Sequence, residues 1–351
     1  MRDILLDIDR WLAEGEKVAL ATVAQTWGSS PRPAGAKMAV TATGRMTGSV
    51  SGGCVEGAVV EESLAALKSG RPRLVHFGVA DETAWEVGLA CGGSIDVFVQ
   101  PLERELYAHL RALLAAERVF AAATLVTGPA AQLGRVRVVA EDGGVFGDLD
   151  PVLADAPARA ALAAGQTTRQ PVPGGELFIE VAWPAPTLVV VGGVHTSIAL
   201  TALAKTLGYR TIVVDPRKAF GSAERFPHVD RLIQKWPDEA LAEIGLSRAT
   251  AVALLTHDPK LDDPGLKQAL PSQAFYVGAL GSASTQAKRR ARLLADGLTE
   301  AQLDRLRGPI GLDLGGRTPE EVALAILAEV VAARNGKLGP AGARSPGVST
   351  R

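Results

Sequence analysis

The apolar positions in the first half of the chain change repeatedly between helical and strand spacing. Over residues 2–14 they recur every three or four positions, which predicts an amphipathic helix that Gly15 ends. A buried strand is predicted over 18–23, and further helices over 54–69 and 103–116. Short strand-like runs occupy 37–41, 46–50, 73–79, 94–99, 119–127 and 135–140. This pattern predicts an α+β domain with a mixed or antiparallel sheet.

A different pattern begins after Pro184-Ala185-Pro186, where two prolines favour an extended linker. Beyond it strands alternate with helices, which predicts a parallel, doubly wound, Rossmann-like sheet. The strands are expected at 188–191, 211–214, 251–255 and 275–277, and the helices at 195–207, 262–270 and 284–296. We therefore predict an α/β protein with an N-terminal domain over 1–183, a C-terminal domain over 187–334 and a mobile tail over 335–351. No internal repeat is apparent.

Two helix starts near the end of the chain have the residues of a capping box. Thr299 stands three positions before Gln302, and Thr318 three before Glu321. A hydroxyl and a long polar side chain at this spacing satisfy each other's backbone N–H groups at a helix start. We expect the last helix to end near Arg334.

Composition narrows the class of protein. The 351 residues are enough for two domains, and 47% apolar with 21% charged residues excludes a disordered chain. With 37 basic against 38 acidic side chains there is no overall field for nucleic acid. Two cysteines form neither a disulfide framework nor a zinc-finger pattern, which fits a reducing cytoplasm. The acidic N-terminus and the absence of about 18 consecutive apolar residues predict a cytoplasmic protein that does not span a membrane.

Three glycine-rich segments of the first half are the candidates for anion binding. They read G-S-S-P-R-P-A-G at 28–35, G-S-V-S-G-G-C-V-E-G at 48–57 and A-C-G-G at 90–93. Consecutive glycine N–H groups can converge on an anion, and serines add hydroxyl donors, so we predict a phosphate cradle. Residues 17–55 hold four basic and no acidic side chains. The candidate residues are Ser29, Ser30, Arg32, Lys37, Ser51, Gly52, Gly53, Gly92 and Gly93. The alternative is a set of hairpin turns with solvated basic side chains.

The two cysteines are candidates for soft ligands or reactive thiols. Cys54 directly precedes the predicted helix, whose free N–H groups favour a thiolate, and Cys91 lies in the third glycine segment. The alternative for each is a small buried apolar residue. His76 lies in a predicted strand and is interpreted as a core or edge residue.

The strand, turn and helix over 189–197 have the setting of a dinucleotide-binding fingerprint, but the glycine spacing is wrong. Val194 and Ser197 stand where that fingerprint needs glycine, which leaves little room for a pyrophosphate. Asp215 ends the next strand, where a ribose-binding carboxylate belongs, although it could equally form a turn with Arg217. The fold signal is therefore stronger than the cofactor signal.

Several polar segments follow the carboxyl ends of the predicted parallel strands, and these ends share one edge of the sheet, where ligands bind. His195 would lie in a first helical turn, which favours its neutral form, or it caps that turn. His228 is interpreted as a loop residue. The candidate binding residues are Gly192, His195, Asp215, His257, Asp258, Gly278, Gly281 and Ser282.

These motifs together resemble the XdhC/CoxI family of accessory factors for molybdenum hydroxylases such as xanthine dehydrogenase and carbon monoxide dehydrogenase. In the first half the resemblance rests on 28–38, 48–57 and 91–93. In the second half it rests on D-P-R at 215–217, E-R-F-P at 224–227, T-H-D at 256–258, G-A-L-G-S at 278–282 and P-I-G-L-D-L-G-G-R-T-P-E-E at 309–321. One departure is Gly192-Gly193-Val194-His195, where family members commonly have G-A-G-H.

The resemblance implies a chaperone that binds the molybdenum cofactor, a molybdopterin with or without a nucleotide. It would protect this cofactor while a cysteine desulfurase supplies the sulfido ligand, and insert it into an apo-hydroxylase. The residues suit this cargo, because the phosphate of a pyranopterin fits glycine N–H groups with Arg32 or Lys37, and soft molybdenum fits Cys54. We expect the cofactor in a cleft between the two domains and consider a homodimer. Two alternatives stay open: an NAD(P)-dependent oxidoreductase, which the broken fingerprint disfavours, and an interaction scaffold without bound cofactor.

Overall fold

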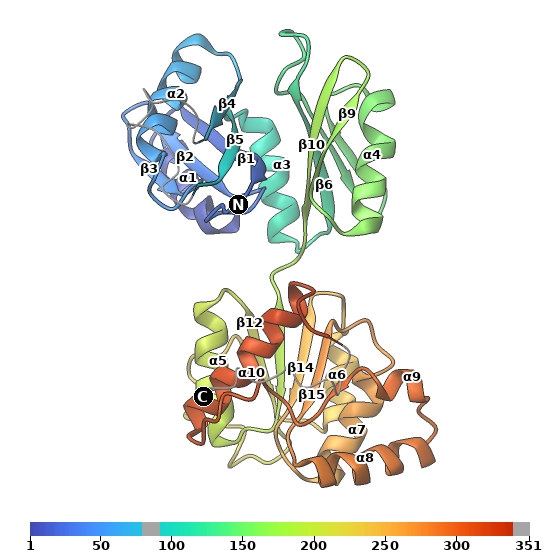
Figure 1. Ribbon diagram of the computed structural model, residues 1–351. Helices are drawn as coiled ribbons and strands as arrows, with labels where there is room; N and C mark the ends of the chain where they lie inside the picture. Colours follow the sequence, from blue (N-terminus) through green and yellow to red (C-terminus); the bar gives the residue numbers. More distant parts are fainter. Residues whose placement is uncertain (79–91, 340–351) are drawn as a thin grey trace. The chain divides into compact units, whose positions relative to one another are not determined.

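The computed structural model describes residues 1–78 and 92–339, so Cys91 and the end of the expected tail lie outside the described residues. The chain divides into two compact units, Met1–Pro184 and Ala185–Arg351 (Figure 1). Within the described ranges, no helix is long and apolar enough to cross a membrane.

The first unit begins with a short helical segment and a five-stranded antiparallel sheet in the order β3-β2-β1-β5-β4. The elements are η1 (Arg2–Ile4), α1 (Leu5–Ala13), β1 (Val18–Trp27), β2 (Lys37–Thr41), β3 (Met46–Gly48), α2 (Glu56–Ser69), β4 (Arg73–Phe77) and β5 (Ser94–Pro101). Helix α2 covers one face of this sheet, where Val59 and Ala66 pack on Val23 and Val97 (Figure 1).

A second antiparallel sheet follows in the order β8-β7-β6-β10-β9. Its elements are α3 (Arg104–Ala115), β6 (Phe120–Thr127), β7 (Val136–Ala140), β8 (Val145–Gly147), α4 (Pro151–Ala164), β9 (Thr168–Val172) and β10 (Gly175–Ala182). Helix α4 covers the face of this sheet formed by Ala121, Leu125 and Ile179. The predicted fold class is confirmed, and of the mixed and antiparallel alternatives the antiparallel one is present, as two sheets where one was expected.

The two sheets are copies of one topology, which corrects the expectation that the chain has no internal repeat. Each copy runs helix, three strands, helix, two strands, and the strands take the same order. Gly48 and Gly147 end the third strand of their copies with positive φ of 79° and 106°, and an added Cβ would collide with the carbonyl oxygen of Lys37 or Val136. The two copies share the order of their elements but no obvious sequence motif, so the repeat could not be predicted from the sequence.

The faces of the two sheets that α2 and α4 leave open pack against each other and against the helices α1 and α3. One cluster joins Ile8 and Trp11 of α1 to Tyr107 of α3 and to Phe120 of the second sheet. A smaller cluster joins Phe98 of the first sheet to Phe178 of the second and their neighbours. The two copies therefore form one compact unit.

The second unit is a six-stranded parallel sheet in the order β13-β12-β11-β14-β15-β16, with helices on both faces. Its elements are β11 (Thr187–Val191), α5 (His195–Thr206), β12 (Arg210–Val214), β13 (Arg231–Ile233), α6 (Pro237–Ile244), β14 (Thr250–Leu254), α7 (Pro259–Ala269), β15 (Tyr276–Ala279), α8 (Ala283–Ala295), α9 (Glu300–Leu303), β16 (Leu306–Arg307) and α10 (Pro319–Arg334). This confirms the predicted Rossmann-like domain.

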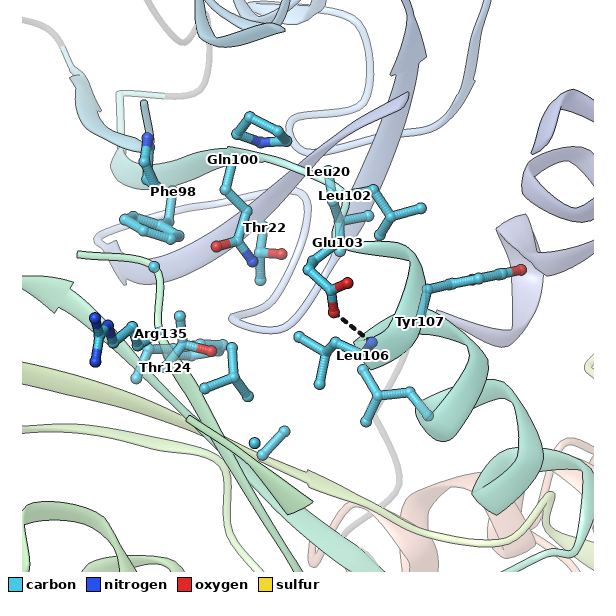
Figure 2. A pocket seen from close by; sticks show the side chains of 18 of the residues that line it. Leu20, Thr22, Phe98, Gln100, Leu102, Glu103, Leu106, Tyr107, Thr124 and Arg135 are labelled. Atoms are coloured by element: carbon cyan, nitrogen blue, oxygen red, sulfur yellow. Dashed lines mark hydrogen bonds between the residues drawn. The ribbon is translucent and has the colours of Figure 1, made fainter. Parts of the chain in front are cut away.

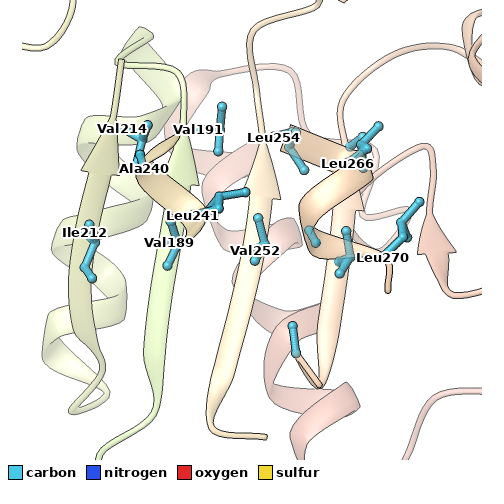
Figure 3. Packing of buried hydrophobic residues seen from close by; sticks show 14 of the residues in the cluster. Val189, Val191, Ile212, Val214, Ala240, Leu241, Val252, Leu254, Leu266 and Leu270 are labelled. Atoms are coloured by element: carbon cyan, nitrogen blue, oxygen red, sulfur yellow. The ribbon is translucent and has the colours of Figure 1, made fainter. Parts of the chain in front are cut away.

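Alternate residues of the buried strands supply two cores, one on each face of the parallel sheet. On one face Val189 and Val252 meet Leu241 of α6 and Leu266 of α7 (Figure 3). On the other face α5 and α10 pack on the sheet. Both predicted capping boxes are present, at Thr299 and Thr318, so these helix starts are confirmed.

Candidate functional site

The glycine-rich segments of the first unit lie side by side. A Cβ added to Gly28 would be 3.4 Å from the Cα of Gly93, and one added to Gly93 would collide with the carbonyl oxygen of Ser29. On the other side of the same loop, a Cβ added to Gly52 would be 3.6 Å from the Cβ of Pro31. The fold therefore gathers segments that are up to 65 residues apart in the sequence at one place.

The backbone N–H groups of the loop between β3 and α2 converge on a carboxylate of the same chain. Oε1 of Glu56 accepts hydrogen bonds from the N–H groups of Val50, Ser51 and Gly52 at 3.2, 2.9 and 3.1 Å. Oε2 accepts one from the N–H of Gly53 at 2.8 Å. The hydroxyls of Ser49 and Ser51 donate to the same carboxylate at 2.6 and 2.5 Å.

This arrangement corrects the predicted phosphate cradle at Ser51, Gly52 and Gly53. Their N–H groups do converge on an anion, but Glu56 supplies that anion from the first turn of α2. Burial of the side chain alone would raise the pKa of Glu56, yet the hydrogen bonds from Ser49, Ser51 and the loop lower it to about 2. The loop is therefore held closed by an internal charge, and a phosphate would have to displace it.

The loop over residues 49–55, held by the carboxylate of Glu56 and called the locked loop below, exposes Cys54 on the surface. Gly52 and Gly53 adopt positive φ of 80° and 119°, which lets the chain turn around the carboxylate before α2 starts. The N–H of Val55 donates to the hydroxyl of Ser51 at 3.0 Å and fixes the other side of the turn. The thiol of Cys54 is free and exposed, as the sequence prediction of an accessible sulfur requires.

The first glycine segment carries three polar candidate residues. Ser29 is exposed, and the hydroxyl of Ser30 donates to the carbonyl oxygen of Arg32 at 2.9 Å. The guanidinium of Arg32 lies 3.8 Å from the carboxylate of Asp3, a loose contact that leaves most of its donors open. Its Nε is buried and has no hydrogen-bond partner within the described part of the chain.

Lys37 does not lie with the glycine segments, which corrects its expected role there. Its side chain is only 5% exposed, and its ammonium contacts Glu180 of β10 at 2.7 Å and the hydroxyl of Thr22 at 3.1 Å. Because β2 is buried along its whole length, the lysine stem points between the two sheets. The positive charge of Lys37, which was expected to bind a phosphate, is instead neutralised by Glu180 inside the first unit.

A cavity of about 620 Å³ lies around this ion pair between the two copies. Equivalent positions of the copies line it: the register pairs Thr22 with Phe98 in the first sheet, and Thr124 with Phe178 in the second. Figure 2 shows Thr22 and Gln100 of the first sheet facing Thr124 of the second. No pattern in the sequence indicates this cavity, because it depends on the unrecognised repeat.

An imidazole held by a buried carboxylate lies next to the glycine segments. The register of β4 and β5 places His76 opposite Asp96, and Nδ1 of His76 is 2.7 Å from Oδ1 of the aspartate. The other carboxylate oxygen accepts a hydrogen bond from Arg169 of β9 at 2.5 Å, and Arg169 also donates to Glu176 at 2.6 Å. The imidazole is exposed, whereas Asp96 and Arg169, which orient it, are each 11% accessible.

A hollow of about 220 Å³ opens beside this histidine. It is lined by Trp27, Gly28, His76, Gly78, Gly92, Gly93 and Ser94. From the sequence, His76 was interpreted as a core or edge residue. The strand pattern does not reveal that Asp96 binds His76 and is itself held by Arg169, 93 residues after the histidine.

At the carboxyl edge of the parallel sheet, the loops after β11 and β14 are in contact. A Cβ on Gly192 would be 2.6 Å from Cγ2 of Thr256. His195 is the exposed first residue of α5, and His257 is exposed with a positive φ of 61°. Asp258 caps α7 by accepting from the N–H of Lys260 at 3.0 Å. The predicted convergence at this edge is therefore present for these segments.

Other candidates of this edge have structural partners instead. Asp215 is 1% exposed and accepts from the N–H of Gly193 at 2.8 Å and from Arg217 at 2.9 and 2.8 Å. Burial opposes its ionisation, but these hydrogen bonds hold the pKa of Asp215 below its usual range. The carboxylate of Asp215 is therefore bound to Arg217, as expected if the two residues form a turn, and is not available to bind a ribose.

The last candidates lie at the end of β15. Gly278 is inside the strand, where a Cβ would be 2.5 Å from the hydroxyl of Tyr276, so packing explains this glycine. Gly281 has a positive φ of 131°, and Ser282 caps α8 by accepting from the N–H of Thr285. Both shape the start of α8 at the sheet edge.

Sequence reasoning also missed a buried charged network behind this edge. Arg289 of α8 is 2% exposed and contacts the fully buried Asp262 of α7 at 2.8 Å. Asp262 in turn accepts from the hydroxyl of Thr256 at 2.5 Å, and burial raises its pKa. The network ties the loop after β14 to two helices. No group of three or more His, Cys, Asp or Glu side chains suited to a metal occurs over residues 1–78 and 92–339.

Comparison with known proteins gives two family matches. Residues 188–330 match the model of the XdhC Rossmann domain, and residues 11–78 match that of the XdhC and CoxI family. The second range contains the two glycine loops, Cys54, Glu56 and His76, and the first contains the parallel sheet.

Individual relatives are similar along nearly the whole chain. The chain is 29% identical over 331 residues to a probable xanthine dehydrogenase subunit of Bacillus subtilis (strain 168), covering 93% of this chain and 96% of that protein. It is 29% identical over 326 residues to the molybdenum cofactor insertion chaperone PaoD of Escherichia coli (strain K12), covering 92% and 85%. A crystal structure described as a xanthine dehydrogenase from Bacillus halodurans superimposes with a TM-score of 0.74 at 25% identity and covers 98% of each chain.

Proposed function

The chain belongs to the XdhC and CoxI family, and we propose that it is a molybdenum cofactor insertion chaperone for a hydroxylase of the xanthine dehydrogenase type. PaoD, similar along 92% of the chain, is a molybdenum cofactor insertion chaperone. The cofactor is the cargo of this protein rather than a resident group. The chain must therefore hold it and release it.

One observation carries the proposal: the locked loop that exposes Cys54. A thiol is a soft ligand that suits molybdenum with sulfur ligands, and a rigid, exposed loop can offer it without a folding cost at each transfer. The hydrogen bonds of Glu56 keep the loop in one conformation. We assign Cys54 as the residue that contacts the metal end of the cargo.

The phosphate end of the cargo needs donors other than the loop amides, which Glu56 occupies. Arg32 and Ser29 lie in the first glycine segment, whose Pro31 lies beside Gly52 of the loop, and the guanidinium of Arg32 makes a loose contact with Asp3 at 3.8 Å. An arginine binds phosphate through two parallel hydrogen bonds, so Arg32 suits this role better than Lys37. Titration with the mononucleotide and dinucleotide forms of the cofactor would show which of them this phosphate end accepts.

We further propose that the protein works with a cysteine desulfurase and an apo-hydroxylase. A terminal sulfido ligand must come from a sulfur donor, and an exposed thiol site leaves the metal end open to one. We propose the polar edge formed by His195, His257 and Asp258 as a separate binding surface of the second unit. NAD(P) is not part of the proposal, because Asp215 is committed to Arg217.

The test is to purify the protein anaerobically from a molybdate-fed host and to measure its molybdenum and pterin. Wild type is expected to hold both and to reconstitute an apo-hydroxylase. Cys54→Ser should lose molybdenum and reconstitution while keeping its fold, and Cys91→Ser is the matched thiol control with a smaller expected loss. Absence of both metal and pterin from wild type would refute the function, whereas full activity of Cys54→Ser would make the thiol structural.

A further inference from the structure

The contacts of Asp96 fix which nitrogen of His76 carries the proton. Asp96 accepts a hydrogen bond from Arg169, and arginine keeps its charge at any pH where the protein is folded, so the aspartate is ionised. An ionised carboxylate can only accept, so Nδ1 of the neutral imidazole must donate to it at 2.7 Å. With Nδ1 as the donor, the lone pair of a neutral imidazole lies on its second ring nitrogen, Nε2.

The nitrogen Nε2 lies beside Gly78, which lines the same hollow as His76. A Cβ added to Gly78 would be 3.0 Å from Nε2 of His76 and 2.9 Å from Cβ of Ser94, and all three residues line the 220 Å³ hollow. The side chain of His76 is 58% exposed while the residues that orient it are buried. Such an oriented, accessible acceptor is a common feature of binding sites.

An aromatic surface stands next to this acceptor. The ring of Trp27 lies 5.8 Å from that of His76, centroid to centroid, with the planes tilted by 57°. Trp27 is 45% exposed although it is a large apolar residue at the end of a strand. An exposed indole beside a polar hollow offers a face for stacking a flat ring.

The size and chemistry of the hollow limit its ligand. Its volume is below the roughly 300 Å³ of pockets that enclose a whole drug-sized ligand, so it suits a single ring system. The ring should be planar, to stack on Trp27, and should carry an N–H or amino donor, to meet the lone pair of His76. A pterin has both features in its aminopyrimidine ring.

We propose that the hollow lined by Trp27 and His76 is the subsite for the pterin ring of the cargo, with His76 accepting from its N–H edge and Trp27 stacking on its face. This inference rests on the proposed function and adds the residues that recognise the organic part of the cofactor. Asp96 and Arg169 are positioning residues, because they act only through the orientation of His76. The hollow adjoins the glycine segments, so one cargo molecule would be held at its ring and at its metal.

The test is calorimetric titration of the purified full chain with a stable, metal-free pterin, 6-hydroxymethylpterin. His76→Ala is expected to weaken binding about five- to tenfold, since one hydrogen bond is lost. Trp27→Leu should weaken it about tenfold through the loss of stacking. His76→Gln, which keeps an acceptor near the position of Nε2, should bind within about threefold of wild type by the same reasoning.

Matched controls exclude a general effect of removing such side chains. His109→Ala removes a histidine that stacks on Phe146, and Trp236→Leu removes an exposed tryptophan of the other unit, so both should bind like wild type. The inference is overturned if wild type ignores the pterin or if His76→Ala binds as His109→Ala does. It is separable from the proposed function, which fails only if wild type carries no molybdenum and pterin after purification.

Discussion

Replacing Glu56 with glutamine tests whether its charge holds the loop that carries Cys54. The amide has nearly the same shape as the carboxylate, but it has one acceptor oxygen in place of two and adds N–H donors. Four backbone N–H groups and two hydroxyls now donate to the carboxylate. In Glu56→Gln, the N–H of Gly53 and the hydroxyl of Ser51 would face an amide N–H group instead of an acceptor.

The lowered pKa sets the size of the expected effect. A shift from 4.5 to about 2 corresponds to roughly 3 kcal/mol, and about 2–3 kcal/mol remains after allowance for solvent at the loop surface. Because the pKa is lower in the folded state, this stabilisation is present above pH 4.5 and is lost as the pH falls toward 2. By pH 3, wild type should have lost about 2 kcal/mol of it.

Amide hydrogen exchange of the loop is the appropriate assay, because a chain of two units need not unfold in one step. At pH 7 the N–H groups of residues 50–53 should lose protection by about thirtyfold in Glu56→Gln, which corresponds to about 2 kcal/mol. The thiol of Cys54 should also react faster with a disulfide reagent. Glu61→Gln, at an exposed position of the same helix, is the matched control.

Equal protection of these amides in wild type and Glu56→Gln would refute the idea that the carboxylate holds the loop. The same conclusion would follow if wild-type protection did not fall between pH 6 and pH 3 relative to the glutamine variant.

Three further predictions concern other parts of the chain. Lys37→Met should lower the free energy of unfolding of the first unit by about 3 kcal/mol in urea, because the half-buried carboxylate of Glu180 is left without its partner. Adding Glu180→Gln should restore most of this loss, and an unrestored double variant would contradict the prediction. Arg32→Ala should weaken binding of a phosphorylated pterin by about 1.5–3 kcal/mol and reduce the salt dependence measured by calorimetry, whereas equal salt dependence would mean that Arg32 only faces solvent. Calorimetry with NAD(H) and NADP(H) should show weak or no binding, because Val194 stands where a pyrophosphate needs glycine; tight binding would instead favour an oxidoreductase.

The Rossmann-like unit could be predicted well because its strands are buried on both faces. A run such as Leu188–Val191 is apolar throughout, and such runs alternate with helices whose starts carry explicit caps, as at Thr318. These signals are local in the sequence. The order of the strands then follows from the general preference of such sheets.

The second copy of the first unit could not be predicted in the same way. Helix α4 is rich in alanine and contains Pro157, so its apolar residues mark no clear face. The strands β9 and β10 were not predicted, although β10 alternates in part between buried and half-buried positions. Without them the repeat, the second sheet and the cavity around Lys37 stayed hidden.

The candidate site was predicted in its composition but not in its contacts. The sequence shows glycines, serines and Cys54 together, and the fold does gather them. It does not show that Glu56, five residues after Ser51, folds back onto the loop, because any helix start tolerates a glutamate. The partnership of Asp96 with Arg169 depends on a contact between two sheets, which no local pattern encodes.

The duplication gives this protein an internal comparison for its own site. Between the third strand and the following helix, the first copy is four residues longer than the second: β3 ends at Gly48 and α2 starts at Glu56, whereas β8 ends at Gly147 and α4 starts at Pro151. The second copy therefore demonstrates that the same scaffold closes without a glycine loop or a thiol. Its short connection, Asp148-Leu149-Asp150, is a ready template for a loop-deleted first copy, in which Leu149 would take the buried place of Val50. The first copy can therefore carry the loop residues that bind the cargo, while the second copy keeps the same scaffold without them.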